Sequence, residues 1–198
     1  MSPDQPRRSA RTRAEILSAA QARFAADGYH KATIRAIAAD AGIDPSMVMR
    51  YYGNKATLFA AAVDIDLRLP DITTIPKRRL GQTLVAHFLA RWEGDPADDV
   101  LLMLLRSAAT DDMAAERMRT IFRHQLTPVV RSVVPDAADA AQRAGLIATQ
   151  MLGLALCRHI LRLPPVAALN ADAVVAHVGP TIQRYLTGGP ASVIRGSP

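Results

Sequence analysis

The segment from Thr33 to Tyr52 carries polar and basic side chains at a spacing that suits contact with duplex DNA. Its first half places four apolar residues on one stripe of a helix: Ile34, Ile37, Ala38 and Ala41. Gly42 then supplies the left-handed or close-packed backbone of a tight turn. Asp44 caps a second helix, and Pro45 in its first turn loses no hydrogen bond that the helix would make. The pattern predicts a helix-turn-helix whose second helix is free to enter a major groove.

The second helix has an inner and an outer side. Val48 and Tyr51 are three residues apart and point back at the first helix. Four residues remain on the outward side: Ser46, Met47, Met49 and Arg50. The two methionines offer only apolar contact, either to a thymine methyl group or to neighbouring side chains.

Two further positions lie at helix starts. Thr33 is a good N-cap, and its hydroxyl and the leading N–H groups of the helix are also placed to meet a phosphate, helped by Arg35; the alternative is a cap and nothing more. Lys55 sits in the first turn of the next helix, after Gly53 and Asn54, where the helix dipole does not favour a cation. A contact with a DNA phosphate would explain a lysine at this position.

The excess of positive charge lies mainly at the front of the chain. The 198 residues carry a formal charge of +6, and residues 1–55 hold nine Lys and Arg against five Asp and Glu. Four arginines precede or open the first helix: Arg7, Arg8, Arg11 and Arg13. We interpret them either as an arm that orders on DNA or as a solvated tail on a disordered segment 1–10. Thr12 and Glu15 form a capping box that predicts the helix start, and Asp27-Gly28 predicts its end.

The rest of the chain reads as helices only. After a fourth helix ending near Leu69, residues 70–79 contain two prolines and a basic cluster, and mark a boundary. Further helices are expected over Leu80–Glu93, Asp98–Ala109, Asp112–Val134 with a bend at Pro128, Asp136–Leu163, and Ala171–Leu186 with a bend at Pro180. We therefore predict an all-α protein of about nine helices, with an N-terminal helix-turn-helix domain over 1–69 (motif 33–52) and a C-terminal domain over 80–187.

Composition and motifs argue against several other classes of protein. Cys157 is the single cysteine, which fits a reducing compartment, and the N-terminus lacks the apolar core of a secretory signal. The longest apolar run is too short and too interrupted to span a membrane, so we expect a cytoplasmic protein. The histidines and Cys157 lack clustered metal-ligand spacing, and no hydrolase, metalloprotease or P-loop motif is present. We expect no cofactor, no metal and no enzymatic activity.

With these elements in place, the first sixty or so residues resemble the DNA-binding domain of TetR-type (tetracycline-repressor family) transcriptional regulators. The matching features are TRAEILSAAQARFAADGY, the T…IA…AG start of the helix-turn-helix, and the closing RYYGNKATLF. The resemblance implies phosphate contacts by Thr33, Arg35, Tyr51 and Lys55. It implies that Pro45, Ser46, Met47 and Arg50 face base edges or the adjoining backbone, and that Tyr52 packs inside. Family members usually carry Tyr where this chain has Met49, so the direct contact of that Tyr with a phosphate is not expected at position 49, and Tyr51 or Arg50 is the expected substitute.

The C-terminal region resembles the family in architecture alone, so its own residues matter more. The predicted helix from Asp136 to Leu163 is apolar on nearly every side, and such a helix must be buried all round. A second subunit would cover its outer face, with the last helix supplying the other half of a four-helix contact, as in family members. We therefore expect a homodimer through the last two helices, which would bind a near-palindromic operator in double-stranded DNA. The alternative is a monomer with an unusually thick core.

Family members often bind a small-molecule effector inside this region. The candidate lining here mixes apolar bulk with a few polar groups: His87, Phe88, Trp92, Met103, Arg106, Phe122, Gln125 and Met151. Each of these residues could instead be ordinary core, and Arg106 could contact an anionic ligand, an acidic neighbour or solvent. Three hypotheses follow: an effector-released repressor, a ligand-independent regulator of the same fold, and a helical interaction protein that lacks DNA binding.

Overall fold

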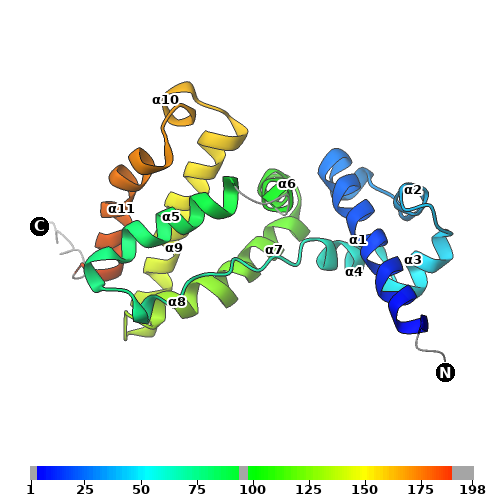
Figure 1. Cartoon of the computed structure of the whole chain (residues 1–198), viewed down its shortest axis with the longest axis horizontal. Coiled ribbons are helices and arrows are strands. Elements are labelled where there is room, and N and C mark those ends of the chain that lie inside the picture. Colours follow the sequence, from blue (N-terminus) through cyan, green and yellow to red (C-terminus); the bar gives the residue numbers. More distant parts are fainter. Residues whose placement is uncertain (1–3, 94–97, 189–198) are drawn as a thin grey trace, which may run out of the picture. The chain divides into compact units, whose positions relative to one another are not determined.

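The structure, a computed structural model, describes residues 4–93 and 98–188 and divides into two compact units (Figure 1). The side chains of residues 4–8, 98 and 99 lie outside the description. The N-terminal unit contains residues up to 66 together with the segment ending at 120, and the C-terminal unit contains the remainder. Segment 98–120 thus packs with the N-terminal helices, although it lies inside the predicted C-terminal domain. The described residues are helical without any strand, which confirms the all-α prediction.

The N-terminal unit is built from four consecutive helices and two later ones. They are α1 (Asp4–Lys31), α2 (Ile34–Asp40), α3 (Pro45–Tyr52), α4 (Lys55–Ala62), α6 (Asp98–Ala108) and α7 (Asp112–Ile121). The predicted capping box at Thr12 is wrong, because α1 already begins at Asp4 and Glu15 pairs with Arg11 one turn earlier, at 2.9 Å. The predicted stop is present: Gly28 interrupts the helical backbone with a φ of 74°. The fourth helix is shorter than predicted, since α4 ends at Ala62.

A buried aromatic cluster joins the ends of α1 and α4. Phe24 and Phe59 are almost fully buried and meet edge to face, with ring centroids 5.0 Å apart. Tyr29 completes the cluster at 4.9 Å from the Phe59 ring. Edge-to-face pairs of this kind add about 0.5–1.5 kcal/mol to what the buried area contributes. The cluster therefore fixes where α4 lies on α1.

A buried carboxylate connects α1 to the start of α7. Asp111 Oδ1 accepts a hydrogen bond from the backbone N–H of Ala114 at 2.9 Å, so it caps α7. Its Oδ2 lies 3.0 Å from Nε2 of the exposed His30, near the end of α1. Only 5% of the Asp111 side chain is exposed, because it lies between the start of α7 and the end of α1.

The C-terminal unit consists of three main helices with shorter segments between them. Its elements are the 3₁₀ turns η1 (Ile72–Thr74) and η2 (Lys77–Arg79), α5 (Leu80–Glu93), the π-helical η3 (Phe122–Leu126), α8 (Thr127–Arg131), α9 (Ala137–Ala155), the π-helical η4 (Leu156–Ile160), α10 (Pro164–Ala167) and α11 (Ala171–Thr187). The predicted helices over 80–93, 136–163 and 171–186 correspond to α5, α9 with η4, and α11.

The irregularity expected at Pro128 is a π-helical segment. Pro128 has no N–H to donate, and its ring would clash with the carbonyl group four residues earlier in a regular helix. The chain widens before it: the backbone N–H of Thr127 bonds to the carbonyl of Phe122, five residues back. The helix thus continues through Pro128 by changing its hydrogen-bond register.

Helices α5 and α11 approach each other more closely than side chains would allow. A Cβ added to Gly81 would lie 2.3 Å from the carbonyl oxygen of Gly179 and 2.5 Å from the backbone nitrogen of Gln183. The Gln183 side chain stabilises the same contact with two hydrogen bonds. Its Oε1 accepts from the backbone N–H of Gly81 at 2.9 Å, and its Nε2 donates to the carbonyl of Lys77 at 2.8 Å. Backbone contact therefore sets the spacing of this helix pair.

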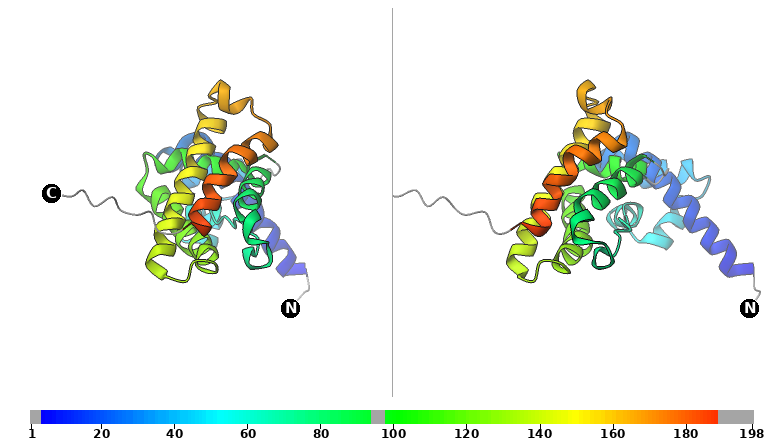
Figure 2. Two further views of the ribbon diagram at one scale, coloured as in Figure 1. Left: turned by 90° about the vertical axis from the view of Figure 1, so that its left-hand side faces the viewer. Right: turned by 60° about the vertical axis from the view of Figure 1, so that its left-hand side comes forward.

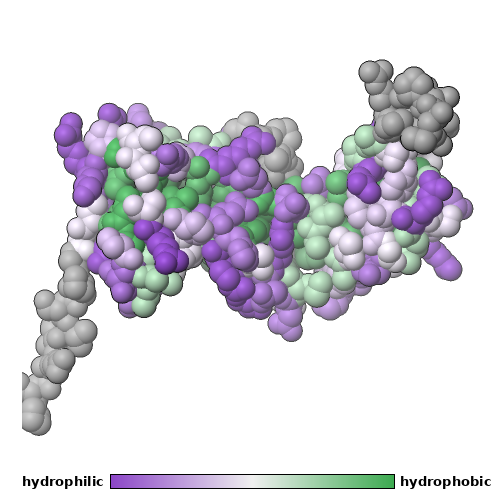
Figure 3. Space-filling view, turned by 90° about the horizontal axis from the view of Figure 1, so that it is seen from below, coloured by the Kyte–Doolittle hydropathy of each residue, from purple (hydrophilic) through white to green (hydrophobic). Residues whose placement is uncertain are grey.

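Helices α9 and α11 lie side by side in the same unit (Figure 2). The buried side of α9 contributes Ile147 and Met151 to the core, while Leu146 on its other side is 41% exposed. Apolar surface also lies open between hydrophilic side chains elsewhere on this unit, as the view from below shows (Figure 3). Part of the apolar surface of α9 thus stays exposed in the single chain.

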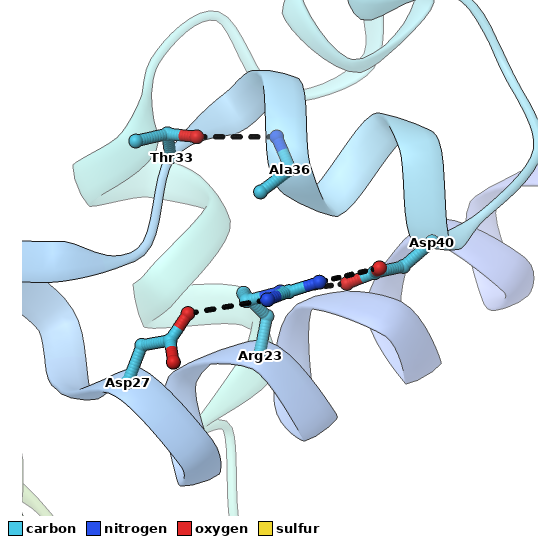
Figure 4. A network of polar contacts seen from close by, with 5 residues as sticks. All are labelled: Arg23, Asp27, Thr33, Ala36 and Asp40. Atoms are coloured by element: carbon cyan, nitrogen blue, oxygen red, sulfur yellow. Dashed lines mark hydrogen bonds and ion pairs between the residues drawn. The ribbon is translucent and has the colours of Figure 1, made fainter.

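An ion pair holds α2 against α1 (Figure 4). The Arg23 guanidinium grips Asp40 with two bonds, Nε to Oδ2 at 2.7 Å and Nη2 to Oδ1 at 2.5 Å, and reaches Asp27 Oδ2 at 3.3 Å. The hydrogen bond from Arg23 lowers the pKa of Asp40 below its ordinary value, and the Asp40 bond raises the pKa of Arg23. Paired, planar bonds of this kind fix an orientation as well as a distance.

We expect Gly81→Ala to destabilise the protein by about 1–3 kcal/mol, because the new methyl group would overlap the α11 backbone. Helix propensity alone predicts the opposite, since Ala is favoured over Gly by about 1 kcal/mol. The exposed Ala86→Gly change measures that propensity in the same helix, α5. Urea unfolding of both variants checks the expectation, and a Gly81→Ala protein as stable as wild type would contradict the close contact.

We expect Asp40→Asn to lower the melting temperature at neutral pH and to do so less as the solution becomes acidic. The folded-state pKa of Asp40 is depressed, so its bond to Arg23 is fully present above the ordinary value of 3.8 and is lost as pH falls through the depressed value. Thermal melts of both proteins from pH 7 down to about 3 measure how the difference between their melting temperatures shrinks as the pH falls. Asp27→Asn, which removes the longer bond, should lower the melting temperature less than Asp40→Asn does. A difference in melting temperature between wild type and Asp40→Asn that is constant with pH would argue against the ion pair.

Candidate nucleic-acid interface

The N-terminus of α2 combines an internal cap with an outward donor. Thr33 Oγ1 accepts a hydrogen bond from the backbone N–H of Ala36 at 3.1 Å (Figure 4). This bond uses the oxygen as acceptor and leaves the hydroxyl proton available to a phosphate, so the two interpretations of Thr33 are compatible. Arg35 is exposed in the first turn of the helix and has no ion pair with any residue described by the structure.

The turn between α2 and α3 has the predicted left-handed glycine. Gly42 has a φ of 65°, and Ile43 N donates back to Ala38 O at 3.0 Å, which closes the end of α2. Asp44 then caps α3 by accepting from Ser46 N at 2.8 Å, with Pro45 in the first turn. Hydrogen bonds from the Ser46 side chain and then its backbone lower the pKa of Asp44. The carboxylate is thus held ionised at the positive end of the helix dipole.

Helix α3 shows the predicted division between an inner and an outer side. Val48 is fully buried, whereas Ser46, Met49 and Arg50 are exposed. Met47 and Pro45 are half-buried at the edges of this surface. An exposed helix surface bearing a hydroxyl group, a thioether and a guanidinium suits contact with base edges and phosphates.

Tyr51 connects α3 to α1. The guanidinium carbons of Arg13 and Arg50 lie 5.7 and 5.5 Å from the Tyr51 ring centroid, so the ring has two cationic neighbours. The hydroxyl groups of Tyr51 and Ser9 are also hydrogen-bonded, with their oxygens 3.3 Å apart. A bond donated by Ser9 stabilises the phenolate and is the main cause of the lowered pKa of Tyr51. Sequence patterns gave no sign of this contact between residues 42 positions apart.

The four arginines proposed as an arm lie within the helical backbone of α1, which begins at Asp4, so residues 4–10 are helical where a disordered segment was expected. Arg11 is 82% exposed on α1, and Arg13 faces Tyr51. Arg7 and Arg8 fall within the helical backbone of α1, but their side chains lie outside the described residues. Tyr52, predicted to pack inside, is half-buried, and its hydroxyl donates to Arg13 O at 3.3 Å; burial raises its pKa.

Lys55 has a partner within the protein that the sequence did not predict. Its Nζ donates to the backbone carbonyl of His30 at 3.2 Å and lies 4.5 Å from the centre of the Tyr29 ring. A carbonyl near the end of α1 and an aromatic face both attract a cation, which explains a lysine in the first turn of α4. The predicted phosphate contact of Lys55 stays a prediction.

The predicted effector-pocket residues are divided between the two units. Met103, which is buried, and Arg106, which is exposed, belong to α6 in the N-terminal unit. Six belong to the C-terminal unit: His87, Phe88, Trp92, Phe122, Gln125 and Met151. Their role in binding a ligand remains a prediction.

Two of these six residues hold a backbone segment. His87 Nε2 lies 2.9 Å from the carbonyl oxygen of Leu67, and Gln125 Oε1 accepts from Leu67 N at 2.7 Å. The neighbouring Arg68 has a φ of 49°, in the left-handed region that residues other than glycine rarely adopt. Both polar groups of Leu67 are therefore tied to predicted pocket residues, next to a strained position.

A cavity of about 290 Å³ lies elsewhere in the C-terminal unit. Its apolar walls include Leu80 and Leu186, and Lys77 and Arg143 supply positive charge. Arg143 is already engaged, since its Nη1 donates to the carbonyls of Tyr185 and Gly188 at the end of α11. None of the predicted pocket residues lines this cavity.

Neither a metal-binding cluster nor a membrane-spanning helix is found among the described residues. No group of three or more His, Cys, Asp and Glu side chains there is arranged to hold a metal ion. Among the helices that the structure describes, none combines the length and hydropathy that crossing a membrane requires.

Comparison with protein-family models identifies both parts of the chain. Residues 16–62 match the model described as bacterial regulatory proteins, tetR family. Residues 79–186, more than half of the chain, match the tetracyclin repressor-like C-terminal domain. No curated protein sequence matches the chain.

Solved structures show the same fold over nearly the whole chain. A TetR-family regulator from Streptomyces coelicolor A3 is 28% identical, with a TM-score of 0.57, covering 94% of this chain and 98% of its own. NalD of Pseudomonas aeruginosa, the secondary repressor of the MexAB-OprM multidrug efflux pump, is 19% identical with a TM-score of 0.69 and coverages of 90% and 97%. FadR of Bacillus subtilis, solved with stearoyl-CoA, is 13% identical with a TM-score of 0.62 and coverages of 89% and 98%. Family models and folds agree, and the chain belongs to the tetR family of DNA-binding transcriptional regulators.

Proposed function

We propose that this regulator is a repressor that binds a near-palindromic operator as a homodimer and is released by a small-molecule effector. The observation that carries DNA binding is the exposed side of α3, where Ser46, Met49 and Arg50 project from a helix capped by Asp44. Thr33 and Arg35 at the start of α2 would hold the flanking phosphates, and Tyr51 and Lys55 would add further backbone contacts. The protein would act in the cytoplasm, on the bacterial chromosome.

Repression, as opposed to activation, is supported by comparison and by simple geometry. NalD, which shares the fold, is described as a repressor. A protein that occupies promoter DNA needs no further contacts to block transcription, whereas an activator must also bind the transcription machinery.

The homodimer is supported by the outer side of α9 and η4. Leu146 and Leu156 are 41% and 40% exposed there. Gly145 and Gly153 lie two helical turns apart, and nothing lies within 4 Å of a Cβ built on either. Large apolar groups beside small residues let a second helix approach closely and bury apolar area. Two-fold pairing would present two copies of α3 to successive major grooves, one helical turn of about 34–36 Å apart.

Effector release is supported by the segments that contain the predicted pocket residues. Phe122 and Gln125 lie in η3, and His159 of η4 stacks on Trp92 of α5 with ring centroids 5.7 Å apart. Single π turns inside helices are frequent at functional sites. A ligand that took the hydrogen bonds of His87 and Gln125 would free the Leu67 backbone, which follows α4 by only a few residues. Coupling of about 1–3 kcal/mol between ligand and DNA would suffice for release.

The first test of this function is operator binding by an Arg50→Ala variant. Binding sites are selected from a randomised duplex library and compared by footprinting with the DNA around the protein's own gene. We expect the substitution to weaken binding by about 1–3 kcal/mol for each half-site, because the guanidinium contacts a base or a phosphate. Affinity is measured over a series of salt concentrations.

The matched control is Arg131→Ala, which removes the same charge from an exposed position on α8. It should bind nearly as wild type does. If Arg50→Ala kept the wild-type affinity and salt slope, Arg50 would be removed from the interface, and a library that yields no binding sequence would refute the proposed function.

The homodimer is tested by Leu156→Lys. The exposed position tolerates lysine in a single chain, but an ammonium group buried between two subunits is costly, so we expect a monomer at micromolar concentration. Light scattering after size-exclusion chromatography gives the mass. Lysine is chosen because added positive charge favours DNA binding, so a loss of operator affinity would reflect lost pairing. Met113→Lys, at a 42% exposed position on α7, is the control that should stay dimeric.

A further inference from the structure

Met49 is the one large hydrophobic side chain that is markedly exposed among the described residues of α1 to α4. It is 44% exposed near the centre of the outward side of α3, one turn after Ser46 and directly before Arg50. Its exposure does not help to pack the unit, because Val48 supplies the inner contact and is fully buried. On a helix proposed to enter a major groove, an exposed apolar side chain between Ser46 and Arg50 is placed to meet an apolar group on the base edges.

Duplex DNA offers one apolar group on its base edges in the major groove, the C5 methyl group of thymine. The neighbours of Met49 narrow the choice further, since the Arg50 guanidinium and the Ser46 hydroxyl donate hydrogen bonds that suit acceptors on bases and phosphates. A thioether supplies no N–H or O–H donor, so Met49 discriminates by contact with a methyl group and not by hydrogen bonding.

We propose that Met49 is a specificity-determining residue that reads the C5 methyl group of a pyrimidine, thymine in ordinary DNA, at one position of each operator half-site. This inference rests on the proposed function and names what one residue of the same surface recognises. The flexible thioether packs over the methyl group, while Arg50 and Ser46 contact polar groups beside it. Because 5-methylcytosine presents the same methyl group, cytosine methylation at that position would strengthen binding.

The experiment removes single methyl groups from the DNA. In an operator selected from the randomised library, each thymine is replaced in turn by uracil, which keeps the base pair and the O4 acceptor and lacks only the C5 methyl group. We expect one position per half-site at which uracil weakens wild-type binding about four-fold, the effect of exposing one buried methyl group. Cytosine and 5-methylcytosine, each paired with guanine at that position, are then compared, which tests the methyl group on a second base.

Protein variants connect this effect to Met49. Met49→Ala should bind uracil and thymine operators equally, whereas Met49→Leu should keep most of the difference because leucine still reaches the methyl group. Met113→Ala, which truncates a similarly exposed methionine on α7, should behave as wild type does. Thermal melting confirms that each variant is folded.

Two results would overturn the inference while leaving the proposed function intact. One is wild-type affinity that is the same for every uracil-containing operator, and the other is a Met49→Ala protein that keeps the full preference for thymine. A wild-type protein that selects no DNA sequence would overturn both the inference and the proposed function.

Discussion

The surface that we propose to face DNA depends on the apolar side of α1. Helices α2, α3 and α4 have only seven or eight residues each, and isolated helices shorter than about 12–15 residues are marginal in water. Helices α2 and α4 pack against α1, whose Ile16, Ala20 and Phe24 are fully buried, and α3 packs against α2 and α4. The caps at Thr33, Asp44 and Asn54 then decide where each short helix begins. Burial supplies the free energy, and the caps fix the geometry that places Arg50 and Met49 outward.

Much of this surface could be predicted because its signals are local. An N-cap and a left-handed glycine act within four residues of themselves, so the sequence identified Thr33, Gly42 and Asp44 correctly. The start of α1 was predicted wrongly because a local signal was followed there too. Thr12 and Glu15 satisfy a capping pattern, yet the residues before them are also compatible with a helix, and Arg11 takes Glu15 as its partner.

Contacts between distant residues could not be predicted from spacing. Lys55 bonds to His30, Tyr51 to Ser9, and Arg23 to Asp40 because α1 passes behind the short helices, and no pattern in one segment records that arrangement. In the C-terminal unit the helices were recognised by their apolar periodicity, but the change of register at η3 depends on how the chain accommodates Pro128. The unusually apolar character of segment 136–163 could be predicted from the sequence, since hydrophobic residues occur on nearly all sides of the expected helix.

The backbone contact at Gly81 and Gly179 has a mechanical consequence. Two helices separated by side chains can slide when those side chains change rotamer, but α5 and α11 touch through main-chain atoms at this point and have no such layer to rearrange. They must move together as one stiff element. We therefore expect a shape change in the C-terminal unit to occur at the π-helical segments η3 and η4 and around Leu67, where hydrogen bonds can be exchanged while α5 and α11 stay in contact.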